Sequence, residues 1–295
     1  MAVPHCRGPV PSRSTGGPTR WRRRRTPARC AGGPSAPGPA ARPRTGRSLH
    51  ATIGNSFRRL GLLDRSEPHL RTALHLRRGL FGPEDVRVAD SLVDLAWHFF
   101  DKGNRRDCLP PAREAIAIYR QAGGSQEDVL EAYYVLQLAL ASIARLETGR
   151  FDEPIAVAQE GLAIAGDLDE VQVPIVASML HTLAAVQYDQ GQYAISEATA
   201  RRAVALHRRL HGRRHPETAW GLDALASALR AQRRRQEASA ASRESLDIFP
   251  DRFPAEHGSV ARARHRLASD LIALGNQAEE LHPPDPGIPG SGLRG

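Results

Sequence analysis

Cysteine, lysine and aromatic residues are scarce in this sequence. Its 295 residues include three cysteines and one lysine, Lys102, and Phe, Trp and Tyr together make up 5%. Three cysteines are too few for a small secreted domain held together by disulfides, which favours a reducing, cytoplasmic location. Long apolar runs are missing as well, since no stretch approaches the roughly 20 apolar residues that a membrane-spanning helix needs. We therefore expect no contact with a membrane.

Acidic residues are absent from the first 48 positions. Residues 1–48 hold 11 arginines, nine prolines and seven glycines, with almost no aliphatic side chain. A core cannot form from this composition, which predicts a disordered tail. Its 11 positive charges exceed the net charge of +9 of the whole chain, so the remainder carries −2. Residues 282–295, rich in proline and glycine, are also expected to be disordered.

Two other origins of the basic segment stay open. An acid-poor, arginine-rich start is typical of an organelle transit peptide. Arginine, proline, glycine and alanine also have GC-rich codons, so translation from a misplaced start in a GC-rich genome would give the same composition. In a genuine tail, Trp21 and the run Arg22–Arg25 could contact nucleic acid in a salt-sensitive manner. Outside the tail we expect no nucleic-acid binding, because the rest of the chain has no basic stripe.

Catalytic motifs are missing too. The sequence contains no glycine-rich phosphate loop, paired-histidine metalloprotease motif, nucleophile elbow or kinase catalytic loop. We therefore expect no enzyme activity, no catalytic residue and no cofactor. His207, His211 and His215 have a metal-like spacing, but Gly212 interrupts the helix between them, and no metal site is predicted. Cys108 takes a small-residue position, which predicts a buried structural thiol.

A repeat dominates the chain from about residue 49 onwards. Three columns of residues recur in phase, mostly at intervals of 42. One column pairs an aliphatic with a small residue, at Ile53-Gly54, Leu95-Ala96, Leu183-Ala184, Leu225-Ala226 and Leu267-Ala268. A second column consists of Gly61, Gly103, Gly149, Gly191, Arg233 and Gly275. A third reverses the order of the first, at Ala73-Leu74, Ala115-Ile116, Gly161-Leu162, Ala203-Val204 and Ser245-Leu246.

Each period predicts a helical hairpin. In residues 173–215, Leu180, Leu183 and Ala184 fall on one helical stripe, Gly191 ends the first helix, and a second helix follows. A lone hairpin cannot bury such a stripe, so neighbouring hairpins must stack. The pattern therefore predicts an all-α fold, an α-solenoid whose concave face is lined by the first helices.

These columns carry a family resemblance. Together with the segment LHGRRHPETAWGLDALASAL they resemble tetratricopeptide repeats, in particular the 42-residue form of kinesin light chains. The resemblance implies a right-handed superhelix over residues 49–281 that binds proteins or peptides. A narrower likeness is to the arrays that follow the kinase domain of large bacterial serine/threonine kinases. Six units fit, at about 47–85, 86–127, 128–172, 173–215, 216–257 and 258–281, the last cut short within its second helix.

Some units depart from the pattern. Arg233 replaces the glycine between the helices of unit five, so that turn must be made differently or the first helix must run longer. In unit three, Leu138-Ala139 stands ten residues before Gly149, where its counterparts stand seven before theirs. Three extra residues are nearly one helical turn, which predicts a local irregularity. The asparagine-rich first helix of kinesin light chains is absent, so their peptide-clamping asparagines are not carried over.

The concave face is the candidate binding surface. Aromatic side chains in a groove anchor partners, and charged ones set their register. The alternative for Trp97 and Trp220 is packing against the neighbouring repeat. Acidic unit two and more basic units one and six favour a ligand with charges of both signs. Projecting the columns forward predicts protein-binding roles for Asn55, Arg58, Arg59, Asp94, Trp97, His181, Tyr188, Trp220, Asp223 and Arg230.

We conclude from the sequence that the chain is a non-enzymatic, protein- or peptide-binding scaffold of a bacterial cytoplasm. The alternative is a detached C-terminal docking or regulatory region of a bacterial serine/threonine kinase signalling protein. Self-association is also predicted at the last unit, because Leu267, Leu271 and Ile272 have little downstream chain to cover them.

Overall fold

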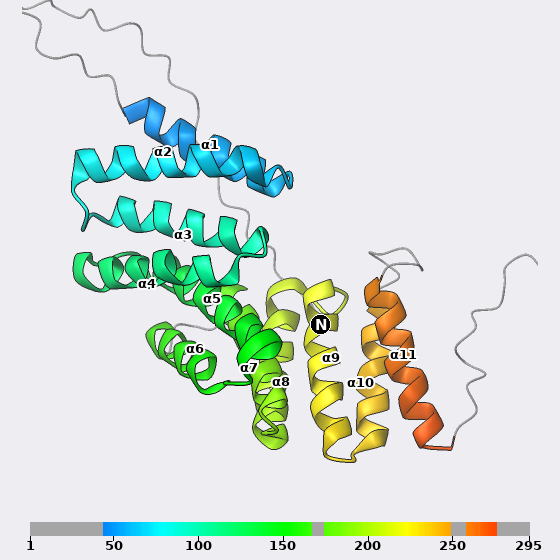
Figure 1. The fold of residues 1–295 in the computed structure, drawn as a ribbon. Helices are drawn as coiled ribbons and strands as arrows, with labels where there is room; N and C mark the ends of the chain where they lie inside the picture. Colours follow the sequence, from blue (N-terminus) through cyan, green and yellow to red (C-terminus); the bar gives the residue numbers. More distant parts are fainter. Residues whose placement is uncertain (1–43, 167–173, 249–257, 276–295) are drawn as a thin grey trace, which may run out of the picture. The chain divides into compact units, whose positions relative to one another are not determined.

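The computed structural model describes residues 44–166, 174–248 and 258–275 (Figure 1). Every regular element within these ranges is helical. The first helix, α1 (Arg44–Arg59), starts before the boundary predicted at residue 49. The rest of the predicted N-terminal tail and all of the predicted C-terminal tail lie outside the described residues.

Consecutive helices form the predicted hairpins. The second helix of each unit packs on the first helix of the same unit and on the first helix of the next one. First helices also contact one another directly, from α1 to α3, α5, α7 and α9 in turn. The elements after α1 are α2 (Leu63–Phe81), α3 (Val86–Asp101), α4 (Arg105–Ala122), α5 (Gln126–Ile143), the π-helix η1 (Ala144–Thr148), α6 (Asp152–Ala165), α7 (Pro174–Asp189), α8 (Tyr193–His211), α9 (Pro216–Ala231), α10 (Arg235–Ile248) and α11 (Gly258–Ala273).

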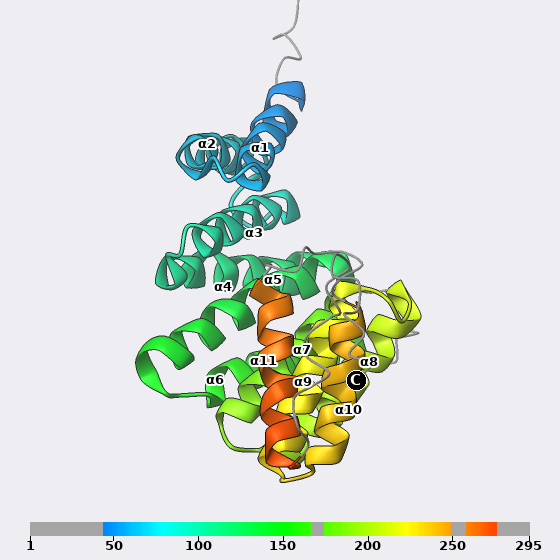
Figure 2. The same ribbon diagram turned by 90° about the vertical axis from the view of Figure 1, so that its right-hand side faces the viewer.

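The predicted α-solenoid is therefore confirmed. Figures 1 and 2 show the hairpins following one another along the array, with the first helices from α1 to α9 each next to the following one. In the sixth unit the structure describes the first helix, α11, and its predicted second helix lies outside the described residues. Within α11, Leu267 and Leu271 are buried and Ile272 is 69% exposed. Self-association through this unit stays a prediction.

Small residues of the repeat columns allow close helix packing. Ala96, Ala184 and Ala226 of the first helices are fully buried, as are Ala73, Ala115 and Ala203 of the second helices to within 1%. A Cβ atom at Gly54 would lie 2.6 Å from a methyl carbon of Leu70 on the partner helix. Real side chains do not tolerate such a distance, so the columns mark positions where a larger residue would push neighbouring helices apart.

The irregularity predicted in unit three is confirmed. The continuous helical segment Gln126–Thr148 comprises 23 residues, whereas α3, α7 and α9 comprise 16 each. Its last turn is a π-helix, in which the amide of Gly149 donates to the carbonyl of Ala144 at 2.8 Å. A π-turn accommodates extra residues without breaking the helix. The additional length of unit three is therefore absorbed at the end of its first helix.

The same segment is long and apolar enough to cross a membrane by length and composition alone. An apolar stretch of 18 residues within it has a mean hydropathy of 1.3, yet 67% of this stretch is buried within the protein. Helices α4, α6 and α7 all pack on α5. This packing identifies the segment as a core helix of the array, and its apolar character arises because it is covered on several sides.

The turn of unit five is made in the same way as the others, which corrects the expectation for Arg233. Helix α9 ends at Ala231, and Arg233 adopts φ = 64°, the left-handed conformation that glycine takes at the equivalent positions. The amide of Arg233 donates to the carbonyl of Arg230 at 3.0 Å, as Gly191 does to Tyr188 at 2.9 Å. The side chain of Arg233 is therefore sterically strained in this conformation, and the geometry of the turn is unchanged.

Histidines stack at the junction of α8 and α9. The ring of His211 lies between those of His207 and His215, with centroid separations of 6.0 Å and 4.4 Å. His215 caps α9 by accepting a hydrogen bond from the backbone amide of Glu217 at its Nδ1 atom, 3.3 Å away. In the described part of the chain, no group of three or more His, Cys, Asp or Glu side chains is placed to hold a metal ion.

Two buried groups show how strongly the core excludes water. His207 is fully buried, and burial, reinforced by neighbouring imidazoles of which His181 has the largest effect, lowers the pKa of His207 to about 4. Cys108 is also fully buried, as predicted, and burial raises the pKa of its thiol to about 12. A thiol with this pKa stays protonated near neutral pH and is a poor nucleophile.

We predict that Arg233→Gly stabilises the protein by about 1 kcal/mol, because glycine adopts positive φ without a Cβ clash. The higher conformational entropy of glycine in the unfolded chain offsets part of this stabilisation. The free energy of unfolding should be measured by urea denaturation. Gln232→Gly serves as the control. Gln232 has φ = −83°, so this change should lower the free energy of unfolding. Unchanged or lower stability of Arg233→Gly would contradict a strained arginine.

His207 makes the fold sensitive to acid. Its pKa is about 4 in the folded protein and about 6.5 when unfolded, so the unfolded chain binds more protons between these values. The stabilisation is complete above about pH 6.5, and the free energy of unfolding should fall by about 1 kcal/mol between about pH 6 and pH 5 on account of His207.

The variant His207→Leu should remove this contribution and flatten the pH dependence of the free energy of unfolding. Urea denaturation across this range of pH checks the prediction. The matched control is His75→Leu, at an exposed imidazole of α2, which should keep the slope of the unaltered protein. Equal slopes for both variants would show that His207 does not resist protonation.

Candidate functional site

The ten predicted binding residues all lie on first helices, in two groups. The first group comprises Asn55, Arg58 and Arg59 of α1 and Asp94 and Trp97 of α3. The second group comprises His181 and Tyr188 of α7 and Trp220, Asp223 and Arg230 of α9.

Most side chains of the first group connect neighbouring units. Asn55 donates to Asp94 at 2.8 Å, and Arg58 forms an ion pair with Asp101 at 2.7 Å. Arg59 is exposed. These contacts join α1 to α3, so Arg58 and Asp94 already have partners within the protein.

Trp97 connects units two and three in the same way. Its indole N–H donates to Glu131 at 3.0 Å, and its ring meets Tyr134 edge to face at a centroid distance of 5.8 Å. Burial raises the pKa of Glu131 and of Asp94, although hydrogen bonds from Trp97 and Asn55 oppose the shift. Trp97 therefore packs against the neighbouring repeat, which was the alternative considered for it.

All members of the second group except Arg230 line a groove. Two adjoining cavities of about 370 Å³ each lie on the face formed by α5, α7, α9 and α11. Arg145, His181, Ala185 and Trp220 line both cavities, which makes them one continuous feature, termed the groove below. The first cavity also includes Tyr188, Asp189, Asp223, Ala224, Ser227 and Arg266. The second includes Tyr134, Leu138, Ala141, Ser142, Ser178, Thr182 and Glu217.

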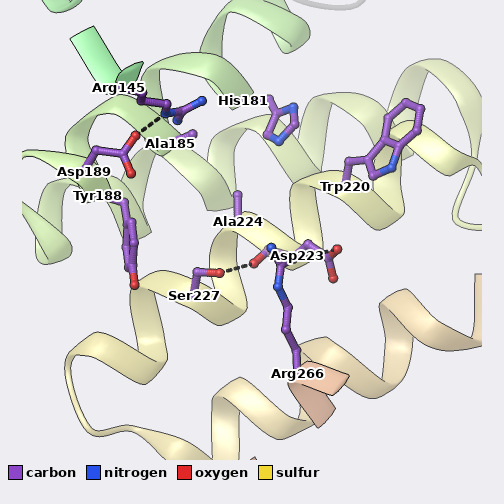
Figure 3. Close-up of a pocket in the computed structure, with 10 residues that line it drawn as sticks. All are labelled: Arg145, His181, Ala185, Tyr188, Asp189, Trp220, Asp223, Ala224, Ser227 and Arg266. Atoms are coloured by element: carbon purple, nitrogen blue, oxygen red, sulfur yellow. Dashed lines mark hydrogen bonds and ion pairs between the residues drawn. The ribbon is translucent and has the colours of Figure 1, made fainter. Parts of the chain in front are cut away.

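Figure 3 shows the first cavity. Ala185 and Ala224 project short side chains between the larger residues, and Tyr188 and Trp220 stand on opposite sides. The space exists because the first helices of units four and five carry alanine where the two aromatic side chains flank it. The arrangement provides apolar contact area bordered by polar groups, which is the usual composition of a binding pocket.

Ion pairs connect the helices around this cavity. Arg145 pairs through its Nε atom with Asp189, joining units three and four. Arg266 pairs with Asp223 at 2.8 Å, joining units five and six. The four charges that line the cavity are therefore paired and largely neutralise each other.

His181 is neutral under ordinary conditions. Burial lowers its pKa to about 4, and the nearby Arg145 guanidinium contributes to the shift. At neutral pH the imidazole offers one hydrogen-bond donor and one acceptor. It can therefore contact a peptide backbone without adding charge to the groove.

Two predicted residues have partners in the next unit that the sequence did not reveal. Asp223 is 8% exposed, and it accepts a hydrogen bond from Ser245 at 2.8 Å in addition to its pair with Arg266. Arg230 holds Asp270, which is fully buried, through two bonds of 2.6 and 2.7 Å. Arg230 does not line either cavity of the groove. Both side chains thus connect units five and six.

Sequence reasoning omitted unit three, which supplies Arg145 and Tyr134, and it also omitted Glu217. The candidate residues were found by counting forward from the aliphatic and small residues of each first helix. In unit three the three extra residues follow that pair, so the count did not reach Arg145. Counting backwards from Gly149 would have placed Arg145 near the turn, as Arg58 and Asp101 are placed before Gly61 and Gly103. The position of Arg145 could therefore have been predicted from the column of turn glycines.

Comparison with known proteins places this architecture in a family. The sequence matches the family model described as tetratricopeptide repeat over residues 44–121 and 175–251, more than half of the chain. No curated protein matches the sequence.

Solved structures of low sequence identity share the fold. Nearly identical TPR-like repeats of a putative kinesin light chain from Podosopora anserina are 18% identical, with 69% of this chain and 95% of that chain covered and a TM-score of 0.56. BtubC (BKLC) from P. vanneervenii is 15% identical, with coverages of 85% and 97% and a TM-score of 0.56.

A third similar structure is the signal transduction ATPase with numerous domains PH0952 from Pyrococcus horikoshii, which has a tetratricopeptide repeat sensor. It is 16% identical, with 79% of this chain and 34% of that chain covered and a TM-score of 0.63. The repeat columns, the stacked hairpins and the match to the family model agree, and the chain belongs to the tetratricopeptide repeat family.

Proposed function

We propose that the groove binds an extended or helical segment of a partner protein, and that the chain serves as a non-enzymatic scaffold in the cytoplasm. The groove runs across the first helices of units three to six, which form the concave face of such arrays, and this continuity carries the proposal. A segment lying across several repeats can contact each of them, so that modest individual contacts add up to specific recognition.

The fold supports an interaction role in general terms. Tetratricopeptide repeats present rows of side chains from stacked hairpins, and such proteins are typically scaffolds for protein interaction. A Rap protein complexed with Competence and Sporulation Factor has the same fold, at 13% identity and a TM-score of 0.52, with 81% of this chain and 67% of that chain covered. That complex supports ligand binding by this type of array.

The three serine hydroxyls of the groove are consistent with a non-enzymatic role. Ser142, Ser178 and Ser227 each donate to the backbone carbonyl four residues earlier, at 2.8, 3.4 and 2.9 Å. A nucleophilic serine would instead bond to a general base such as His181. These serines therefore complete the surface of their helices and are not activated.

The kinase-associated alternative stays a prediction. It would make the groove a docking site for an enzyme encoded by a neighbouring or continuous reading frame. A kinase catalytic loop in the sequence immediately upstream would favour this alternative, and its absence there would favour an independent scaffold.

We predict that Tyr188→Ala weakens partner binding at least about tenfold, because central aromatic residues contribute most of the binding energy. Tyr193→Ala is a matched control: the two side chains are 37% and 38% exposed and their rings lie 5.4 Å apart, but Tyr193 does not line the groove. Partners should be isolated from the native host with the unaltered protein, and their affinities for both variants measured by calorimetry. Equal loss or equal retention in the two variants would contradict binding in the groove.

A further inference from the structure

We infer that the partner segment presents three groups to the groove: a cation to Glu217, a bulky apolar side chain to the cavity between Tyr188 and Trp220, and a carboxylate to Arg145. This inference rests on the proposed function and specifies its ligand. It follows from which polar groups of the groove already have partners in the protein and which do not.

Glu217 is a carboxylate that has no counterion among the described residues. It lies in the first turn of α9, is half-buried, and lines the second cavity. Burial raises its pKa, and His211 opposes this shift without forming an ion pair with it. No arginine, lysine or histidine of the described residues forms an ion pair with Glu217.

The other carboxylates of the groove differ from Glu217 in this respect. Asp189 is paired with Arg145, and Asp223 with Arg266 and Ser245. A half-buried carboxylate loses hydration, and an approaching cation restores the lost electrostatic stabilisation. Glu217 is therefore the position at which a lysine, arginine or terminal amine of a partner is most favourable.

Arg145 provides the opposite charge. Its Nε atom is engaged by Asp189, but a guanidinium has five N–H donors, and its side chain is 42% exposed. Figure 3 shows the far end of this guanidinium extending into the cavity on the side of His181. A carboxylate of the partner can accept from these remaining donors, which match its geometry.

The apolar group is specified by the space of the first cavity. Ala185 and Ala224 leave a volume of about 370 Å³ flanked by Tyr188 and Trp220. A large aliphatic or aromatic side chain buries most apolar area in such a space. His181 is neutral, so it adds hydrogen-bonding capacity beside this side chain without requiring a charged ligand.

The charges of the groove disfavour a polyanion. Arg145 and Arg266 stand against Asp189, Asp223 and Glu217, which gives a net charge of −1 for the ionised groups that line it. Nucleic acid requires an excess of positive charge to displace its counterions. A peptide that carries both a basic and an acidic residue matches these groups instead.

The test begins with random twelve-residue peptides displayed on phage and selected on the full-length chain. The enriched peptides should share a basic, a bulky apolar and an acidic residue. A synthetic peptide of the enriched sequence is then titrated against the unaltered protein and the variants Glu217→Gln, Arg145→Gln and Tyr188→Ala by fluorescence anisotropy.

The expected result is a specific coupling between charges. Glu217→Gln should weaken binding about tenfold, but should have little effect on a peptide whose basic residue is replaced by alanine. Arg145→Gln should behave in the same way towards the acidic residue. Glu127→Gln is the matched control, since Glu127 is an exposed carboxylate in the first turn of α5 that does not line the groove. It should leave the affinity unchanged.

Other outcomes separate the inference from the proposed function. Peptides that lose binding with Tyr188→Ala but show no charge coupling would overturn the inference and leave the groove as the binding site. Peptides that bind equally well to Tyr188→Ala would overturn both. A selection that enriches no peptide would overturn the inference, because unpaired groups of both signs should favour some sequences over others.

Discussion

Close contact between small residues of neighbouring helices is the constraint on which this array depends. A single hairpin has no core, so its apolar stripe is buried only when the next hairpin packs against it. Gly161 of α6 illustrates how little space these contacts leave, because an added Cβ atom would lie 2.5 Å from Met179 of α7 and 3.0 Å from Tyr133 of α5. Burial across such interfaces supplies the stability of the fold, and the small residues determine how near the helices can come.

Stacking also brings together charges that are about one repeat apart in the sequence. Arg58 meets Asp101, Arg145 meets Asp189, and Arg230 meets Asp270. The first two pairs reach the solvent and contribute at most about 1 kcal/mol each, so they are poor evidence for stability, whereas Asp270 of the third pair is fully buried. They also neutralise charges along the first helices, and this is why the proposed ligand contacts are assigned to Glu217 and to the remaining donors of Arg145.

Two irregularities in the repeats have different structural consequences. The extra residues of unit three are absorbed in a π-turn, and this unit contributes Arg145 to the groove four residues before the turn glycine Gly149. In unit five, Arg233 accepts a strained conformation and the turn keeps its geometry. A terminal insertion therefore lengthens a helix, whereas a substitution inside the turn is forced into the existing hydrogen-bond pattern, because the packed helices on either side fix both ends of that turn.

The sequence by itself determined the class of fold and the positions of the hairpins, because the columns of small and aliphatic residues report helix packing that repeats with each unit. It also placed His181, Tyr188 and Trp220 on the groove, since residues of one helical face can be counted from those columns. Only the tertiary structure decided that Asp223 pairs with Arg266 and Arg230 with Asp270, and that no described residue forms an ion pair with the Glu217 carboxylate. Periodicity specifies the face on which a side chain lies. Its partner across the interface depends on the stagger and spacing of two helices, which arise from the packing of all their side chains together.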